Sequence, residues 1–256
     1  MKNFLLVLGV FMTLFVFVSN SLGKADTCSL DVRVTNLPPL YFQDESGKWT
    51  GLTVDLAKVL LTEAGCEGDF RVIPWARSLK SMGTGSLDMM MNLTMTEERK
   101  EFINFIGPQI DETANLIIRK EIDVDIQSLD DIKKLPGKIG YQRGTFLGNE
   151  FEKKLKFDPA FKNKFEIIHS DELNIKKLRA GRIIGFIEHT YSGITSKKEI
   201  GKGTDFKIHP FVIYKNPVYF GFSKKSVSKE LLVKFQKAYD KAKSEGKFEK
   251  VLNRYK

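Results

Sequence analysis

The sequence predicts an α/β protein made of two units of similar size. From Leu30 onward, short runs with strand character alternate with amphipathic helical patterns, an alternation typical of mainly parallel sheets. The alternation restarts after Ser128, and no Ser-rich or Gly-rich linker separates the two halves. We therefore expect two lobes, each a mainly parallel sheet flanked by helices, joined by extended strands.

In the first half, apolar periodicity and residues that end helices predict the helices and strands. Leu52, Leu56, Val59 and Leu60 fall on one face of a helix that Gly65 ends. The expected elements are, in order, strand 30–36, helix 52–65, strand 70–74, helix 76–83, strand 87–93, a short helix after Thr96 and an extended segment at 115–121.

The second half repeats this pattern. Ser128 can cap the helical segment that follows it, and the last part of the chain is strongly amphipathic. The expected elements are helix 129–135, strand 138–144, helix 146–157, strand 165–170, helix 171–181, strand 183–189, an extended segment at 206–226 and C-terminal helix at 229–256.

The first 25 residues have the features of a secretory signal peptide. Lys2 precedes an uncharged apolar run at 4–18, and small polar residues follow. The run is short for a membrane span, which needs roughly 20 residues. Cleavage after Gly23 or Ala25 suits the small-residue rule, and "ADTC" lacks the apolar residues of a lipid anchor site at Cys28. We expect a soluble protein exported to the periplasm.

The chain has two cysteines, Cys28 and Cys66, and each lies just ahead of a predicted strand. If those strands are parallel neighbours, their starts lie at one edge of the sheet, where a disulfide is geometrically easy. The alternative is two unrelated buried thiols. Export favours the bridge, because an oxidising compartment permits it.

Composition argues against several classes of function. The net charge is +9, but the lysines are scattered and no basic cluster is interleaved with aromatics, so we expect no nucleic-acid partner. His169, His189 and His209 have no metal-like spacing with one another or with the cysteines. No Gly-rich phosphate loop or Gly-x-Ser-x-Gly motif is present, and we expect neither a metal nor a cofactor.

Arg99 stands where local rules would not put an arginine. Thr96 can cap a helix, and the position three residues after such a cap usually carries Glu or Gln. A helix start exposes unpaired N–H groups and partial positive charge, so a cation there is mildly repelled. Either Arg99 extends into water, or Arg99 and the helix end together face an anion.

The order of these motifs resembles the amino-acid type (family 3) of bacterial periplasmic solute-binding proteins, over nearly all of the mature chain. The stretches that carry the resemblance are "LPPLYFQDESGKWTGLTVDLAKVL", "PWARSLKSMGTGSLDMMMNLTMTEERKEFINF", "SLDDIKKLPGKIGYQRGT", "LRAGRIIGFIEHTYSG" and "SEGKFEKVLNRYK". The resemblance implies the two-lobed (type II) periplasmic binding protein fold with two crossover strands. Its parts would be signal peptide 1–25, lobe 1 at 26–118 and 217–256, and lobe 2 at 119–216.

The resemblance also assigns roles on the first lobe. The arginine of the "T-x-T-x-x-R" segment, here Arg99, would grip the ligand's α-carboxylate with its planar guanidinium. Thr94 would support the same carboxylate, and Asn92 precedes it at a position that often lines the site.

On the second lobe, Gly144 and Thr145 match a turn whose backbone N–H groups approach the ligand. Glu188 falls where the family usually has an Asp that binds the ligand's ammonium group. A carboxylate at the end of the apolar "IIGFI" run is costly to bury without a cation. The alternative partner for Glu188 is one of the many lysines.

In the family, aromatic side chains form a wall of the ligand site, and this chain departs from that pattern. Leu37 stands where amino-acid binders often carry a Tyr or Phe, while Trp75 matches the second aromatic position. Tyr41 or Phe42 could compensate, although Phe42 also suits the core. Arg77 belongs to a "P-W-x-R" stretch found in a related subgroup. If Arg77 points into the cleft it favours an acidic ligand, and otherwise it is a surface cation.

These observations lead to one primary hypothesis: a monomeric periplasmic receptor that binds a small zwitterionic or carboxylate ligand, an amino acid or analogue, and delivers it to the membrane permease of an ABC transporter. One alternative is a periplasmic sensor component that presents its closed form to a signalling receptor. The other is an enzyme similar to cyclohexadienyl dehydratases, with Glu188 as general acid.

Overall fold

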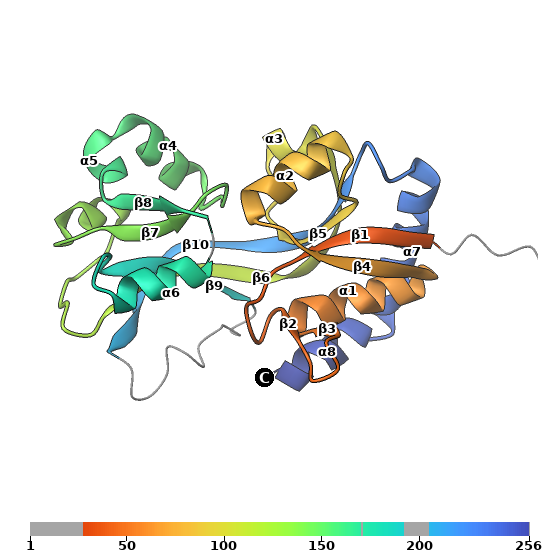
Figure 1. Cartoon of the computed structure of the whole chain (residues 1–256). Helices are drawn as coiled ribbons and strands as arrows, with labels where there is room; N and C mark the ends of the chain where they lie inside the picture. The colour runs from red at the N-terminus through yellow and green to blue at the C-terminus, as the bar shows by residue number, and fades with distance from the viewer. Residues whose placement is uncertain (1–27, 170, 192–204, 256) are drawn as a thin grey trace, which may run out of the picture.

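The computed structural model describes residues 28–169, 171–191 and 205–255, so the expected signal peptide lies outside the described residues. Figure 1 shows two lobes with helices on both faces of a sheet that continues from one lobe into the other. That sheet has eight strands in the order β4-β1-β5-β10-β6-β9-β7-β8. The expected two-lobed α/β architecture is present.

The first lobe is built mainly from the N-terminal elements. They are β1 (Cys28–Val34), β2 (Phe42–Gln43), β3 (Trp49–Thr50), α1 (Leu52–Glu63), β4 (Cys66–Val72), α2 (Trp75–Thr84), β5 (Met89–Leu93) and α3 (Glu97–Lys100). Strand β1 pairs in parallel with both β4 and β5, and β2 and β3 form a separate small hairpin.

The second lobe follows the long strand β6 (Ile103–Arg119). Its elements are the 3-10 helix η1 (Leu129–Lys134), β7 (Ile139–Gln142), α4 (Asn149–Phe157), α5 (Pro159–Lys162), β8 (Phe165–Ile168), α6 (Asp171–Arg179) and β9 (Gly185–Tyr191). Strand β7 pairs in parallel with β8 and β9. The chain returns through β10 (Phe206–Ser223) to α7 (Lys229–Ser244) and α8 (Lys247–Tyr255) in the first lobe.

Strands β6 and β10 are the two crossover strands. They pair antiparallel along most of their length, and Figure 1 shows both running from one lobe into the other. The expected lobe boundaries, at 118/119 and 216/217, fall within these strands and stay a prediction. Ala114, Leu116 and Ile118 of β6 already pack in the core of the second lobe.

Each lobe has its own apolar core. In the first, the buried faces of β1, α1 and α7 meet around Phe220, Phe222 and Phe235. In the second, Phe151, Phe161 and Phe165 pack with ring centroids 5.0–5.3 Å apart. Separate cores joined by two strands permit the lobes to move as units.

The disulfide Cys28–Cys66 is formed, as expected. Cys28 and Cys66 are paired residues in the parallel register of β1 and β4, with Cα atoms 4.5 Å apart. It therefore joins the starts of two neighbouring strands.

Several boundaries differ from the expected ones. Strand β4 begins at Cys66, four residues before the expected start at Phe70. The C-terminal helical segment is two helices, because Gly246 adopts a positive φ of 64° between α7 and α8. The helix after Thr96 is short, as expected, because the chain leaves it after Lys100 and enters β6 at Ile103.

Candidate functional site

A pocket lies where β6 and β9 meet the carboxyl ends of β1, β5 and β7, the usual place for a ligand in parallel α/β sheets. Its free volume is about 40 Å³, which suits only a few water-sized occupants. The lining residues are Arg33, Thr35, Leu37, Tyr41, Trp75, Asn92, Thr94, Arg99, Glu112, Gln142, Thr145, Phe146, Glu188, His189 and Tyr191.

Arg99 is 6% exposed and reaches this pocket rather than bulk water. Its backbone N–H donates to the Thr96 hydroxyl at 3.2 Å, which completes the cap of α3. Its side chain bends back, so that Nη1 donates to the Thr94 carbonyl at 2.8 Å and Nη2 to the Gly144 carbonyl at 3.0 Å. Burial lowers the pKa of Arg99, and the nearby Glu112 carboxylate opposes that effect.

Gly144 joins the lobes through its carbonyl oxygen. This oxygen accepts hydrogen bonds from Arg99 and from Nε1 of Trp75, at 3.0 Å each, and both donors belong to the first lobe. Gly144 has a φ of 82°, and a Cβ there would lie 3.4 Å from Leu79 and 3.5 Å from Trp75. Those distances are ordinary contacts, so it is the positive φ that favours glycine here, and the group that Gly144 contributes in this conformation is its carbonyl.

Thr145, expected to offer its N–H to a ligand, uses that group within the turn. Its N–H donates to the Gln142 carbonyl at 3.3 Å, while its side chain lines the pocket. The Thr145 hydroxyl in turn donates to Gln142 Oε1 at 3.5 Å.

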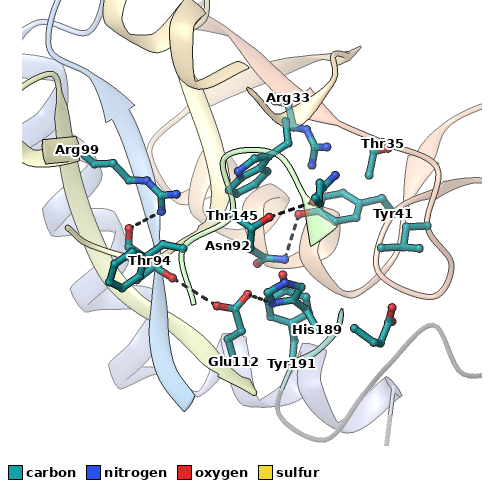
Figure 2. Close-up of a pocket in the computed structure, with 15 residues that line it drawn as sticks. Arg33, Thr35, Tyr41, Asn92, Thr94, Arg99, Glu112, Thr145, His189 and Tyr191 are labelled. Carbon is teal, nitrogen blue, oxygen red and sulfur yellow. Dashed lines mark hydrogen bonds and ion pairs between the residues drawn. The ribbon is translucent and has the colours of Figure 1, made fainter. Parts of the chain in front are cut away.

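A charged cluster that the sequence analysis missed lies below Arg99 in Figure 2. Glu112 of β6 is 4% exposed, with Oε1 3.0 Å from His189 Nδ1 of β9. Thr94 donates its hydroxyl to Oε2 of Glu112 at 3.4 Å. Burial and this carboxylate raise the pKa of the neighbouring Tyr214 to about 12. Only the pairing of β6 with β9 brings Glu112 and His189 together.

Glu188 is 6% exposed and lines the same pocket. It precedes His189 on β9 and faces Asn115 of β6 in the strand register. The pocket thus holds two buried carboxylates, Glu112 and Glu188, together with Arg99.

The aromatic wall contains an arginine. Tyr41 and Trp75 both line the pocket, as does Leu37. Between the two rings lies Arg33, whose Cζ is 5.7 Å from the ring centroid of Tyr41 and 5.3 Å from that of Trp75. The sequence analysis treated Arg33 only as part of a strand.

Asn92 supports this wall. It is the penultimate residue of β5 and has a φ of 56°, unusual for a residue other than glycine. Its side-chain amide donates to the Tyr41 hydroxyl at 3.0 Å and to the Thr53 hydroxyl at 3.1 Å. Asn92 therefore holds the Tyr41 hydroxyl in place and itself lines the pocket.

Arg77 is exposed on α2 and does not line the pocket. Of the sequence-derived site residues, the pocket therefore gathers all but Arg77 and Gly144, the latter contributing through its contacts with Arg99 and Trp75. Among the described residues, no group of His, Cys, Asp and Glu side chains is arranged to hold a metal ion. Within the same residues, no helix combines the length and the apolar character that a membrane crossing requires.

The comparison with known families decides the class of protein. The sequence profile of the bacterial extracellular solute-binding proteins, family 3, matches residues 31–256. The chain belongs to this family. It is a family 3 solute-binding protein, and the family works outside the cytoplasm.

Individual relatives of this solute-binding protein are distant. It is 26% identical over 238 residues to a probable amino-acid-binding protein, YxeM, of Bacillus subtilis (strain 168), covering 92% of this chain and 87% of the relative. An ancestral arginine-binding protein bound to arginine has a TM-score of 0.73 at 24% identity, covering 89% of this chain and 97% of that one.

A second solved structure is an ancestral amino acid-binding protein described as a precursor of cyclohexadienyl dehydratase. It has a TM-score of 0.68 at 24% identity, covering 89% of this chain and 94% of that chain. At this level of identity, the solved structures establish the shared fold.

Proposed function

We propose that this chain is a periplasmic receptor that closes around a small zwitterionic ligand, an amino acid or close analogue, and delivers it to an ABC-type permease. The observation that carries the proposal is the buried pair of opposite charges in one pocket, Arg99 from the first lobe and Glu188 from β9. A zwitterion presents a carboxylate and an ammonium group, one for each. The amino-acid-binding names of the relatives agree with this ligand class.

Binding requires the lobes to part, since the free volume of about 40 Å³ does not admit an amino acid. Separation breaks the bonds from Arg99 and Trp75 to the Gly144 carbonyl and frees their N–H groups. The bond from Arg99 to the Thr94 carbonyl lies within the first lobe and keeps the guanidinium in place. The ligand's carboxylate then takes the freed donors, and Glu188 adds its contact on closure.

The first prediction concerns Arg99. The Arg99→Ala variant is expected to lose about 2–5 kcal/mol of binding free energy, as when one partner of a buried charged pair is truncated. The measurement is calorimetric titration of the mature protein with the amino acid that raises its melting temperature most. A ligand at 100 times its dissociation constant adds roughly 2.7 kcal/mol of stability, so a thermal-melting panel finds it.

The matched control is Arg77→Ala, which removes an arginine of the same lobe that is exposed and outside the pocket. The Arg99→Lys variant keeps the charge but lacks the planar fork, and should fall between wild type and Arg99→Ala. Wild-type affinity in a folded Arg99→Ala protein would refute the role of Arg99.

We further propose that the chain binds without turnover. The alternative, a dehydratase, has one observation in its favour: Glu188, Glu112 and His189 line one pocket and could exchange protons. An assay with prephenate and arogenate decides between the two, because a binding protein leaves both compounds unchanged.

A further inference from the structure

Arg33 is a second buried cation of the pocket, and the proposed function does not use it. Arg33 is 4% exposed, and its Nε donates to the Ile73 carbonyl at 3.1 Å. This bond and the flanking rings of Tyr41 and Trp75 hold the guanidinium in one orientation. Figure 2 shows Arg33 and Arg99 reaching the pocket from different sides.

No acidic side chain of the described residues pairs with Arg33. Other arginines of the chain do have such partners: Arg71 lies 2.6 Å from Asp31, and Arg254 lies 3.3 Å from Asp55. The terminal nitrogens of Arg33 make no hydrogen bond within the described part of the chain, although the residue is almost fully buried and lines the pocket. A buried guanidinium held only by ring faces and one carbonyl is costly without an anion.

The charges around the pocket identify what is missing. If a zwitterion binds, its carboxylate meets Arg99 and its ammonium group meets Glu188. Glu112 already lies 3.0 Å from His189. The Glu112 carboxylate also acts on Arg99, whereas no acidic side chain of the described residues forms an ion pair with Arg33. Arg33 is therefore the cation that lacks an anion, and the complementary ligand carries one more negative charge.

We propose that Arg33 binds a second anionic group on the ligand, and that the ligand is a dicarboxylic amino acid. This inference rests on the proposed function. Arg33 would take the side-chain carboxylate between the rings of Tyr41 and Trp75, where a planar guanidinium offers two parallel donors. The same charge repels the cationic side chain of arginine, the ligand in the ancestral arginine-binding protein of the same fold.

The test compares pairs of ligands that differ in one group. The mature wild-type protein is titrated with L-glutamate against L-glutamine, with L-aspartate against L-asparagine, and with L-arginine. At least one acid is expected to bind at least about tenfold more tightly than its amide, the effect of a charged hydrogen bond, and more tightly than arginine. Equal or tighter binding of both amides, or of arginine, would overturn the inference.

The variant Arg33→Met removes the charge and keeps an unbranched side chain beside the rings. It is expected to reduce the ratio of acid to amide affinity to near one, whereas Arg33→Lys retains part of the preference. Arg77→Met, an exposed arginine outside the pocket, is the control and should leave the ratio unchanged. An acid preference that survives in a folded Arg33→Met protein would contradict the role of Arg33. If Arg33→Met does not fold, the wild-type ligand pairs and Arg33→Lys decide.

The two proposals fail in different ways. If amino acids bind and Arg99→Ala abolishes binding, but amides or arginine are preferred, only the role of Arg33 is wrong. If no amino acid binds, whether acidic, neutral or basic, the proposed function fails as well.

Discussion

A buried arginine needs acceptors, and Arg99 and Arg33 obtain them in different ways. Arg99 contributes its backbone N–H to the cap of α3 while its guanidinium leaves the helix start for two carbonyl oxygens. Those acceptors offset the mild repulsion from the exposed N–H groups of the helix. Arg33 instead has two ring faces and a single carbonyl. The arginine with fewer polar partners is the one we expect to select the ligand's side chain.

Tyr255 gives a prediction about pH at the scale of one residue. Its hydroxyl donates to Asp55 Oδ2 at 2.8 Å, joining α8 to α1. Burial, and then this hydrogen bond, raise the pKa of Tyr255 from 10.0 to about 12. A group whose pKa is raised on folding contributes stability that is complete below the unfolded pKa and is lost as pH rises through the folded one. The contribution of Tyr255 is therefore present below pH 10 and lost between about pH 10 and 12.

Thermal melting of wild type and Tyr255→Phe from pH 8 to pH 12 checks this. The variant should melt below wild type at pH 8, and the difference should shrink as the pH approaches 12. A difference that stays constant over this range would show that the hydroxyl's titration is not linked to folding.

At the scale of elements, the parallel register of β1 and β4 explains the disulfide. Both strands begin at a cysteine, and the paired positions place the two Cα atoms 4.5 Å apart. The bridge closes a loop that contains the hairpin and α1, with a sequence separation of 38. Cross-linking such a loop restricts the unfolded chain.

Loss of this bridge should cost roughly 2–4 kcal/mol of unfolding free energy, or about 4–16 °C in melting temperature for a chain of this size. The measurement is melting of wild type and of the Cys28→Ser, Cys66→Ser double variant, each with and without dithiothreitol. The reductant should lower the melting temperature of wild type only. A wild-type protein indifferent to reductant, with the bridge shown to be reduced, would contradict the prediction.

At the scale of the whole molecule, strands β6 and β10 and the Gly144 carbonyl oxygen all connect the lobes. Strands β6 and β10 connect the lobes, and the Gly144 carbonyl accepts donors from Arg99 and Trp75 across the gap. If the lobes separate on opening, these two hydrogen bonds are among the contacts that break.

Trp75→Phe removes the donor and keeps an aromatic ring. Losing one hydrogen bond of about 0.5–1.5 kcal/mol should lower the ratio of closed to open ligand-free protein by roughly 2- to 12-fold. Energy transfer between one dye on each lobe measures this ratio. Trp49→Phe is the matched control, since Trp49 packs against the first-lobe core outside the pocket. Identical distance distributions in Trp75→Phe and Trp49→Phe would exclude a role for the Gly144 contact.

Much of the fold could be predicted because its signals are local. Alternating strand and helix patterns, the Gly65 helix end and the capping Ser128 depend on neighbouring residues. The break in the C-terminal segment was harder to predict, because Gly246 adopts a positive φ between two stretches that share one helical periodicity. The disulfide could be predicted because the expected export and the positions of Cys28 and Cys66 just before predicted strands both favoured a bridge.

By itself, the sequence determined the α/β alternation, the paired cysteines and the conspicuous position of Arg99 after a capping threonine. Only the tertiary structure decided that Arg33 lies between Tyr41 and Trp75, and that Glu112 lies beside His189. The physical reason is that periodicity predicts which face of an element is buried. It does not predict which side chains from β1, α2, β6 and β9 will meet, because strand order and register bring them together.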